Sequence, residues 1–217
     1  MDVKDKICVV TGAASGIGRA LCVAFKDAGA AEVVCVDRNG DGAAETAEMV
    51  GGAAYTVDVA REDQIKDMID SVERDIGPID LFWSNAGIAV GGGMDTPNDA
   101  WQRVWDVNVM SHVWAAVGLA EWIAMTHGDE GIKVSVLCPQ AVRTEMTRGH
   151  EDHVAAINGM MEPEPVAQIC LQAIQDETFL ILPHPEVREY MKNKTDDYDR
   201  WIGGMRKLNR KFGSMDM

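Results

Sequence analysis

The 217-residue sequence has few basic residues beside its acidic ones: 20 Lys and Arg stand against 35 Asp and Glu, a formal net charge of -15. Because phosphate backbones are bound by concentrated Lys and Arg, this balance argues against a nucleic-acid partner. The sequence also lacks a run of about 18 apolar residues that could span a bilayer. The opening MDVKDKICVVTG enters an apolar stretch without the pattern of a signal peptide. We therefore expect no membrane partner and a cytoplasmic location.

Cysteine is sparse and shows no regular spacing. The five cysteines, Cys8, Cys22, Cys35, Cys138 and Cys170, are odd in number, scattered and mostly set in apolar runs. Disulfide frameworks and metal sites need regularly spaced cysteines. We therefore expect reduced thiols that pack as small core hydrophobes, with no disulfide and no metal.

No linker, repeat or low-complexity segment divides the chain, and 47% hydrophobic content suits one full-sized core. Short β-branched runs alternate with helical patterns, which is typical of a parallel sheet covered by helices. The expected strands are residues 6–10, 32–36, 54–57, 79–84, 133–138 and 179–182. The expected helices are residues 18–28, 42–50, 62–76, 165–175, a long one opening at Pro97, and an amphipathic C-terminal one over 198–212. The fold class is therefore α/β, with a doubly wound parallel sheet in a single domain over residues 1–217.

A glycine-rich turn lies between the first expected strand and the first expected helix. It carries Gly12, Ser15, Gly16, Ile17 and Gly18. Glycines allow close backbone approach, and a helix N-terminus favours negative charge, so this turn can hold the pyrophosphate of a dinucleotide. By itself the run is equally compatible with a plain tight turn.

The second strand ends at Asp37, about twenty residues past the glycines, where a carboxylate can accept hydrogen bonds from an adenosine ribose. The same carboxylate repels a 2′-phosphate, which favours NAD over NADP, although the neighbouring Arg38 weakens that preference. The alternative for Asp37 is a solvated strand end. Together the turn and the carboxylate predict a Rossmann-type sheet that binds NAD.

The spacing TGxxxGIG resembles that of the short-chain dehydrogenase/reductase family, and later segments agree in order along the whole chain. Asp58 and Val59 follow the third strand, where that family contacts adenine, and Asn85-Ala86-Gly87 resembles its NAG element. Asn108 resembles the family's helix asparagine, which holds a water in a proton relay. Pro139-Gln140-Ala141-Val142-Arg143-Thr144 is similar to the family's PGxVxT loop beside the nicotinamide, with Gln140 in place of glycine. The resemblance implies that Asn108 is the catalytic residue present, and that Pro139, Val142 and Thr144 contact the cofactor.

The resemblance also implies a Ser, a Tyr and a Lys that transfer the proton when hydride moves between an alcohol or carbonyl and the cofactor. All three belong between the asparagine helix and the PGxVxT loop. In this chain that interval is only Val109 to Cys138, it contains no tyrosine, and the join falls near Ala116 and Val117. A Tyr190-x-x-x-Lys194 match lies beyond the last strand and fits a surface helix better.

Ser111 and His112, one turn past Asn108, fit helix residues without a chemical role. The resemblance also implies that the shortening removes the fifth, central strand of the family's sheet, so that the strands on either side must close up or leave backbone groups unpaired. Apolar positions keep helical spacing across the join, which predicts one fused helix over 99–127 with a kink near Gly118 or a projecting end.

Three interpretations remain open: an NAD-dependent oxidoreductase that is inactive or severely impaired, an NAD-binding pseudoenzyme or assembly partner, or a truncated product of an intact dehydrogenase. The nucleotide sequence around the codons of Ala116 and Val117 would separate them.

The substrate, if the chain is active, is a small alcohol or carbonyl compound. Residues 145–162 are expected to form a substrate lid, in which Met146, Met160 and Met161 either line an apolar pocket or simply pack. The 198–212 helix is expected to pack by its apolar stripe on the core or on a second subunit of a homo-oligomer.

Overall fold

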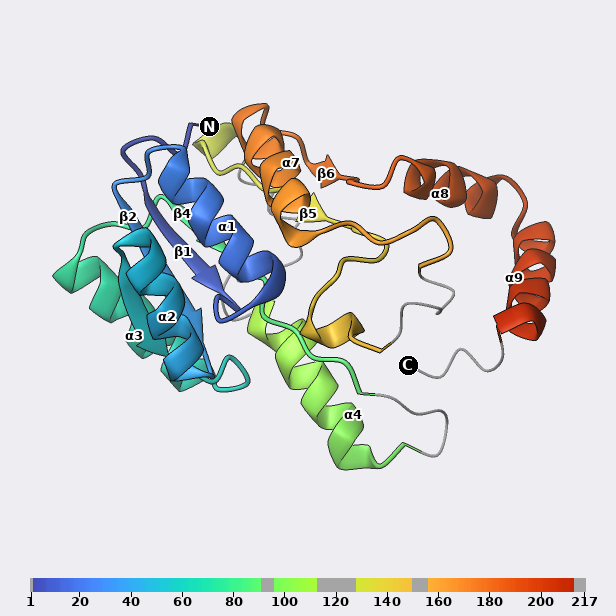
Figure 1. The fold of residues 1–217 in the computed structure, drawn as a ribbon, viewed down its shortest axis with the longest axis horizontal. Coiled ribbons are helices and arrows are strands. Elements are labelled where there is room, and N and C mark those ends of the chain that lie inside the picture. Colours follow the sequence, from blue (N-terminus) through green and yellow to red (C-terminus); the bar gives the residue numbers. More distant parts are fainter. Residues whose placement is uncertain (1, 91–95, 113–127, 150–155, 213–217) are drawn as a thin grey trace.

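The computed structural model describes residues 2–90, 96–112, 128–149 and 156–212 (Figure 1). Four parallel strands form the main sheet in the order β3-β2-β1-β4. They are β1 (Ile7–Thr11), β2 (Glu32–Asp37), β3 (Ala53–Thr56) and β4 (Leu81–Trp83). The connecting helices are α1 (Gly16–Asp27), α2 (Gly40–Val50) and α3 (Glu62–Asp75). The expected α/β fold with a parallel sheet is thus confirmed.

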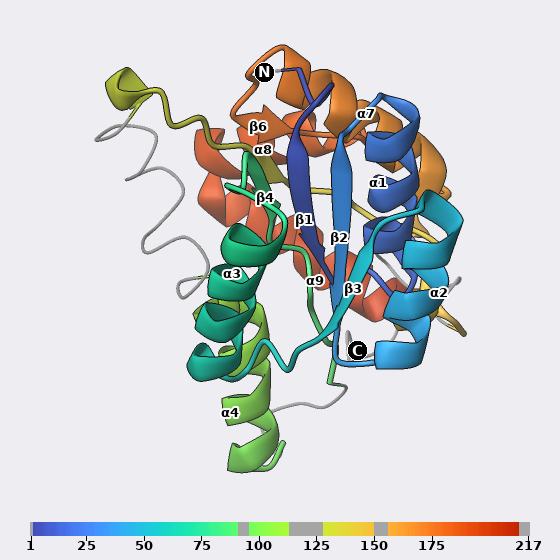
Figure 2. The ribbon, with the colours of Figure 1, turned by 90° about the vertical axis from the view of Figure 1, so that its left-hand side faces the viewer.

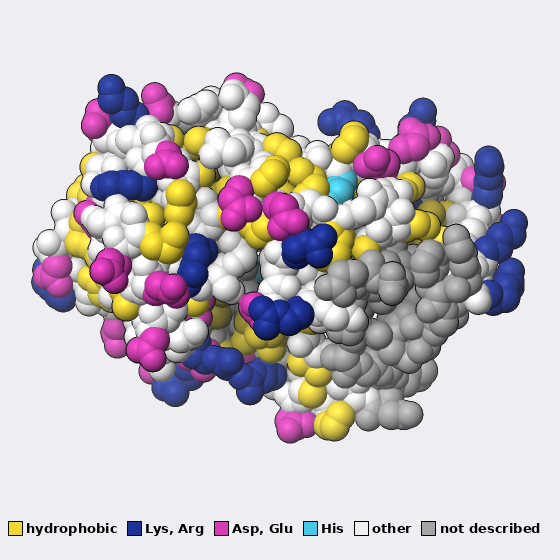
Figure 3. Space-filling view, in the orientation of Figure 1, with side chains coloured by type: hydrophobic (Ala, Val, Ile, Leu, Met, Phe, Trp, Pro, Cys, Tyr) yellow, Lys and Arg dark blue, Asp and Glu magenta, His cyan; other side chains and the backbone are white. Residues whose placement is uncertain are grey.

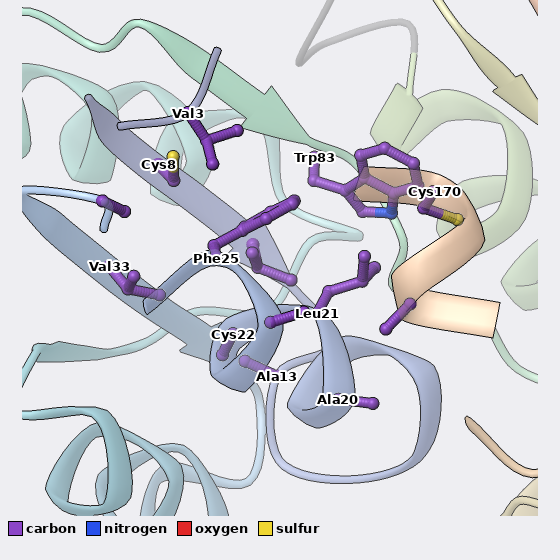
Figure 4. Packing of buried hydrophobic residues seen from close by; sticks show 14 of the residues in the cluster. Val3, Cys8, Ala13, Ala20, Leu21, Cys22, Phe25, Val33, Trp83 and Cys170 are labelled. Atoms are coloured by element: carbon purple, nitrogen blue, oxygen red, sulfur yellow. The ribbon is translucent and has the colours of Figure 1, made fainter. Parts of the chain in front are cut away.

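The two middle strands, β1 and β2, are buried on both faces because apolar residues fill nearly all of their positions, whereas β3 at the edge is only partly buried. On β1, Cys8 and Val10 join the core cluster on the α1 side, whereas Val9 joins the cluster on the α3 side. This period-two alternation follows from the pleat of a strand. Figure 2 shows α3 and α4 on one face of the sheet and α1, α2 and α7 on the other. Phe25 of α1 and Trp83 of β4 meet edge to face in the first cluster, with ring centroids 6.3 Å apart (Figure 4).

The last two strands form a sheet of their own. β5 (Val136–Leu137) pairs in parallel with β6 (Leu180–Ile181), and in the described residues neither pairs with β4. The helix between them, α7 (Pro163–Gln175), packs beside α1, so the two sheets share one core. In the described residues the strands are therefore divided between two sheets, and β4 and β5 have not closed up on each other, which is consistent with the predicted loss of a central strand.

The helix that follows β4 changes its winding in the middle. α4 (Asn98–Trp105) continues into a π-helical turn, η1 (Asp106–Met110), that contains Asn108. Trp101 and Trp105 on α4 are 56% and 53% exposed, so this part of the expected apolar stripe is not covered by described residues. Helix is observed from residue 98 to residue 112, whereas the expected fusion near Ala116 and the expected kink near Gly118 lie outside the described residues.

Short 3-10 turns and two terminal helices complete the described chain: η2 (Gly128–Glu130), η3 (Glu145–Thr147), α8 (Glu186–Asp196) and α9 (Tyr198–Phe212). α8 and α9 extend from β6 at the end of the molecule opposite α3 (Figure 1). All five cysteines are free thiols. No helix within the described ranges is both long and apolar enough to cross a membrane.

Candidate functional site

The glycine turn adopts a conformation that only glycine takes readily. Gly12 and Gly16 have φ angles of +72° and +55°, in the left-handed region. A Cβ on Gly18 would overlap the carbonyl oxygen of Gly12 and would lie 2.9 Å from Asn85 Nδ2. The first turn of α1 therefore lies directly against the preceding turn. Amides of a first helical turn have no intrahelical acceptor, so this helix start offers N–H groups to an anion.

Asp37 ties the end of β2 to the glycine turn. Its Oδ2 accepts from the Ala14 amide at 3.0 Å, and its Oδ1 accepts from the Asn39 amide at 2.9 Å. The carboxylate thus occupies a defined position beside the turn. Arg38 and Asn39 follow Asp37 in the chain, and all three residues line the pocket described below.

A buried hydroxyl fixes the start of the Asn85-Ala86-Gly87 element. Thr11 Oγ1 accepts from the amides of Asn85 at 2.9 Å and Ala86 at 3.0 Å, while Asn85 Nδ2 donates to the Thr11 carbonyl at 3.0 Å. Thr11 is 3% exposed. The sequence marks Thr11 only as the first residue of the TG pattern, so this anchoring role could not be predicted from it.

Asn108 binds the backbone of Ile88, the residue that follows the Asn85-Ala86-Gly87 element. Its Oδ1 accepts from the Ile88 amide and its Nδ2 donates to the Ile88 carbonyl, both at 2.8 Å. A Cβ on Gly87 would lie 3.6 Å from Asn108 Oδ1. The asparagine side chain is therefore engaged with backbone, which makes it a positioning residue for the loop behind the pocket.

After β3, Asp58 accepts from the Ala60 amide at 3.1 Å, and the Asp58 amide donates to Gln64 Oε1 at 2.8 Å. The neighbouring Val59 is 8% exposed. These contacts turn the chain sharply at the carboxyl edge of the sheet, where open α/β sheets bind ligands.

These strand ends surround one pocket of about 400 Å³. Its wall contains most of the residues that the sequence singled out: Gly12, Ser15, Gly16, Ile17, Asp37, Asp58, Val59, Asn85, Ala86, Gly87 and Thr144. Four others do not line it, namely Gly18, Asn108, Pro139 and Val142. Gly18 and Asn108 support the wall from behind through the contacts above. Among the described residues, no Tyr and no Lys lies on this wall.

The loop after β5 reaches the pocket only at its far end. A Cβ on Gly16 would lie 3.0 Å from Thr144 Cγ2, so the loop and the glycine turn touch there. Val142 is 5% exposed and pairs with Met161 in an isolated β-bridge. Met146 lines the pocket, whereas Met161 packs against the core cluster. Met146 therefore lies at the candidate nucleotide pocket and Met161 serves packing, while the substrate lid over residues 145–162 stays a prediction.

Two histidine contacts near the strand ends were not anticipated. Ser84 Oγ lies 2.6 Å from His112 Nδ1, and burial lowers the pKa of His112 below its ordinary value. His184 is 4% exposed, and its Nδ1 accepts from the Gln140 amide at 3.1 Å. Both pairs join residues far apart in the sequence, and no local motif marks them.

The Tyr190-x-x-x-Lys194 match does not assemble at the pocket. Tyr190 lies on α8, where its hydroxyl lies 2.6 Å from Asn158 Nδ2, the donor of that hydrogen bond. Lys194 Nζ lies over the Trp201 ring, 4.8 Å from its centroid. Tyr190 therefore joins α8 to the segment that contains Asn158, and Lys194 joins α8 to α9. Within the described residues, no group of three or more His, Cys, Asp or Glu is arranged to hold a metal ion.

The parallel sheet, the glycine turn at a helix start and the pocket at the carboxyl edge define a Rossmann-type α/β protein. More narrowly, the chain belongs to the short chain dehydrogenase family, a family of oxidoreductases, because that family's model matches residues 6–121.

Known members of the family resemble the chain over most of its length. Epidermal retinol dehydrogenase 2 of Mus musculus is 26% identical, with 84% of this chain and 75% of the relative covered. The 1-deoxy-11-beta-hydroxypentalenate dehydrogenase of Streptomyces exfoliatus is 28% identical, with 93% and 91% covered. A solved structure of a short chain dehydrogenase/reductase from Burkholderia phymatum in complex with NAD superimposes with a TM-score of 0.79 at 22% identity, covering 92% of this chain and 96% of that one. The last similarity concerns the fold alone.

Proposed function

We propose that the chain binds NAD in the pocket at the carboxyl edge of the sheet, and that its capacity for hydride transfer on alcohols or carbonyl compounds is lost or severely impaired. The observation that carries the binding proposal is the convergence of Gly12, Asp37, Asp58 and Asn85 from four strand ends on one pocket. The related Burkholderia phymatum protein, which has the same fold, was solved with NAD.

The residues present fit a dinucleotide. The positive φ angles of Gly12 and Gly16 and the absent Cβ of Gly18 leave room for a pyrophosphate beside the first turn of α1. Asp37 keeps acceptor capacity beyond its two backbone bonds, since a carboxylate has about four lone-pair sites. We therefore assign the adenosine ribose to Asp37. NAD is favoured over NADP because a 2′-phosphate would meet this carboxylate, although Arg38 on the same wall offers a competing cation.

A bound nicotinamide cofactor would supply the hydride acceptor, whereas the proton must be handled by the protein. Between Val109 and Cys138 the chain has no tyrosine, and so it has no Tyr-x-x-x-Lys pair of the family's kind there. The alignment with the Streptomyces exfoliatus enzyme runs over 252 positions, more than the 217 residues of this chain, so that relative contains residues without a counterpart here. Positioned acid–base help contributes about 10²–10⁴ in rate. The division of the described strands into two sheets supports the same proposal, since it is consistent with the loss of a central strand beside the active cleft.

Fluorescence titration with NADH and NADPH tests the binding proposal. We expect tighter binding of NADH, and we expect Asp37→Ala to weaken NADH while relaxing the discrimination against NADPH. Equal or tighter NADPH binding by the unaltered chain would contradict the role of Asp37.

Turnover is tested in parallel by NADH oxidation with a broad panel of carbonyl compounds. We expect no appreciable rate in the unaltered chain. Tyr190→Phe and Lys194→Ala serve as controls, because neither residue lies on the pocket wall. Robust turnover that survives both changes would reveal an unrecognised acid–base group, and turnover abolished by them would make the α8 pair catalytic.

A retained nucleotide pocket without its acid–base residues also fits an NAD-binding pseudoenzyme that assembles with an intact relative. NADH binding without turnover is expected of both candidates, whereas assembly with an intact relative is expected of this second candidate alone. The nucleotide sequence around the codons of Ala116 and Val117 distinguishes the pseudoenzyme from a truncated product. A join that preserves the reading frame is compatible with a pseudoenzyme.

A further inference from the structure

Two buried thiols face each other between α1 and β2. The sulfurs of Cys22, on α1, and Cys35, on β2, are 3.6 Å apart. Both residues are 0% exposed and belong to the core cluster shown in part in Figure 4, where Cys22 and Val33 are labelled. The S–S bond of a disulfide is about 2.0 Å long, so the sulfurs need to approach by roughly 1.5 Å to bond.

The pair is joined directly to the nucleotide pocket. Cys35 precedes Asp37 by two positions on β2, and Cys22 lies on the helix that opens with Gly16. Between them, the Ala13 amide donates to the Val36 carbonyl at 3.1 Å, and the Ala14 amide donates to Asp37 Oδ2 at 3.0 Å. A change in the spacing of α1 and β2 therefore displaces the glycine turn relative to Asp37.

We propose that Cys22 and Cys35 form a reversible dithiol–disulfide pair, whose oxidation lowers the affinity of the neighbouring pocket for its nucleotide. The crosslink itself is independent of the proposed function, whereas its effect on NADH rests on that function.

The two thiols differ in their readiness to ionise. The Cys22 thiol can donate to an ionised Cys35, which lowers the pKa of Cys35 and raises the pKa of Cys22. Burial raises the pKa of the nearby Cys8 to about 12, so Cys8 is the poorer nucleophile. The Cys35 thiolate attacks one oxygen of a peroxide such as hydrogen peroxide, and it becomes a sulfenic acid as water is released. Cys22 then attacks this sulfur, the S–S bond forms and a second water leaves, so two electrons pass from the thiols to the peroxide.

Tryptic peptide mapping of the full chain after hydrogen peroxide treatment tests the crosslink. Each thiol falls in its own peptide, Cys8 in residues 7–19, Cys22 in 20–26 and Cys35 in 27–38. After free thiols are blocked, we expect peptides 20–26 and 27–38 to appear joined, lighter by two hydrogens and separable by dithiothreitol. Because both thiols are buried, the bond should form slowly, through local opening of α1. The joined peptide should vanish in Cys35→Ser and persist in the matched control Cys8→Ser.

NADH titration of the reduced and oxidised chain tests the coupling. We expect a dissociation constant about fivefold or more higher after oxidation, with recovery upon reduction. Absence of the joined peptide from a chain that keeps its circular dichroism, or equal crosslinking through Cys8, would overturn the pair. Unchanged NADH affinity would overturn the switch. If the reduced chain binds no NADH, the proposed function and the coupling both fail, while the peptide map still decides the crosslink.

Discussion

Replacing Gly18 with Ala should destabilise the protein and distort the candidate pocket, although alanine favours helices. A Cβ at this position would overlap the Gly12 carbonyl oxygen and lie 2.7 Å from the Gly12 carbonyl carbon. The obstacle is main chain, which cannot turn away as a side chain could. Overpacking typically costs about 1–3 kcal/mol, and we expect the upper end here. Alanine in place of glycine returns about 1 kcal/mol in a helix interior, which leaves a net loss of about 2 kcal/mol.

The chain contains a matched control in Gly204, which lies inside α9, where an added Cβ would meet no atom within 4 Å. Gly204→Ala therefore carries only the helix preference, and it should raise stability by at most about 1 kcal/mol. The two substitutions are chemically identical but should act with opposite signs. Urea unfolding followed by tryptophan fluorescence, together with NADH titration, measures both effects.

Gly18→Ala should lower both the free energy of unfolding and the affinity for NADH, because the displaced Gly12 turn forms part of the pocket wall. NADH binding should be weakened well beyond the change seen in Gly204→Ala. A Gly18→Ala protein that matches the unaltered chain in both stability and NADH affinity would refute the close packing of the turn against α1.

Three further outcomes follow from described contacts. Asn108→Asp replaces the donor to the Ile88 carbonyl with an acceptor, so the free energy of unfolding measured in urea should fall by about 2 kcal/mol or more. An unchanged free energy of unfolding would show that Asn108 does not position the loop at Ile88. Burial holds the pKa of His112 below the ordinary 6.5, so the unfolded chain binds the proton more readily than the folded chain. The free energy of unfolding should therefore fall as the pH drops below about 6.5. Urea unfolding of His112→Gln should lack this part of the decline. α9 exposes basic side chains, seen along the right-hand edge of Figure 3, yet binding to DNA or anionic vesicles should be absent at physiological salt, because the whole chain carries a net charge of -15.

Local sequence was sufficient for much of the fold. The strand at Glu32–Asp37 and the helix that ends at Val50 were predicted nearly to the residue, because β-branched runs and helical periodicity are properties of adjacent residues. Most of the residues that line the candidate pocket were singled out from the sequence, because turn glycines followed by a strand-end carboxylate have a recognisable spacing. That they bind a dinucleotide stays a prediction. The absence of a tyrosine between Val109 and Cys138 is likewise a property of the sequence alone.

Tertiary structure decided what depends on distant residues meeting. The sequence left open whether the strands on either side of the predicted gap would close up, and in the described residues the sheet is divided between β4 and β5. Strand pairing depends on long-range contacts, which the local sequence does not determine. Thr11 beneath Asn85, Ser84 beside His112, and Cys22 against Cys35 are likewise pairs separated by many residues. The sequence thus determined which elements form and which chemistry is present or missing. Only the packing of those elements determined which side chains touch, since a contact between distant residues leaves no periodic trace in the chain.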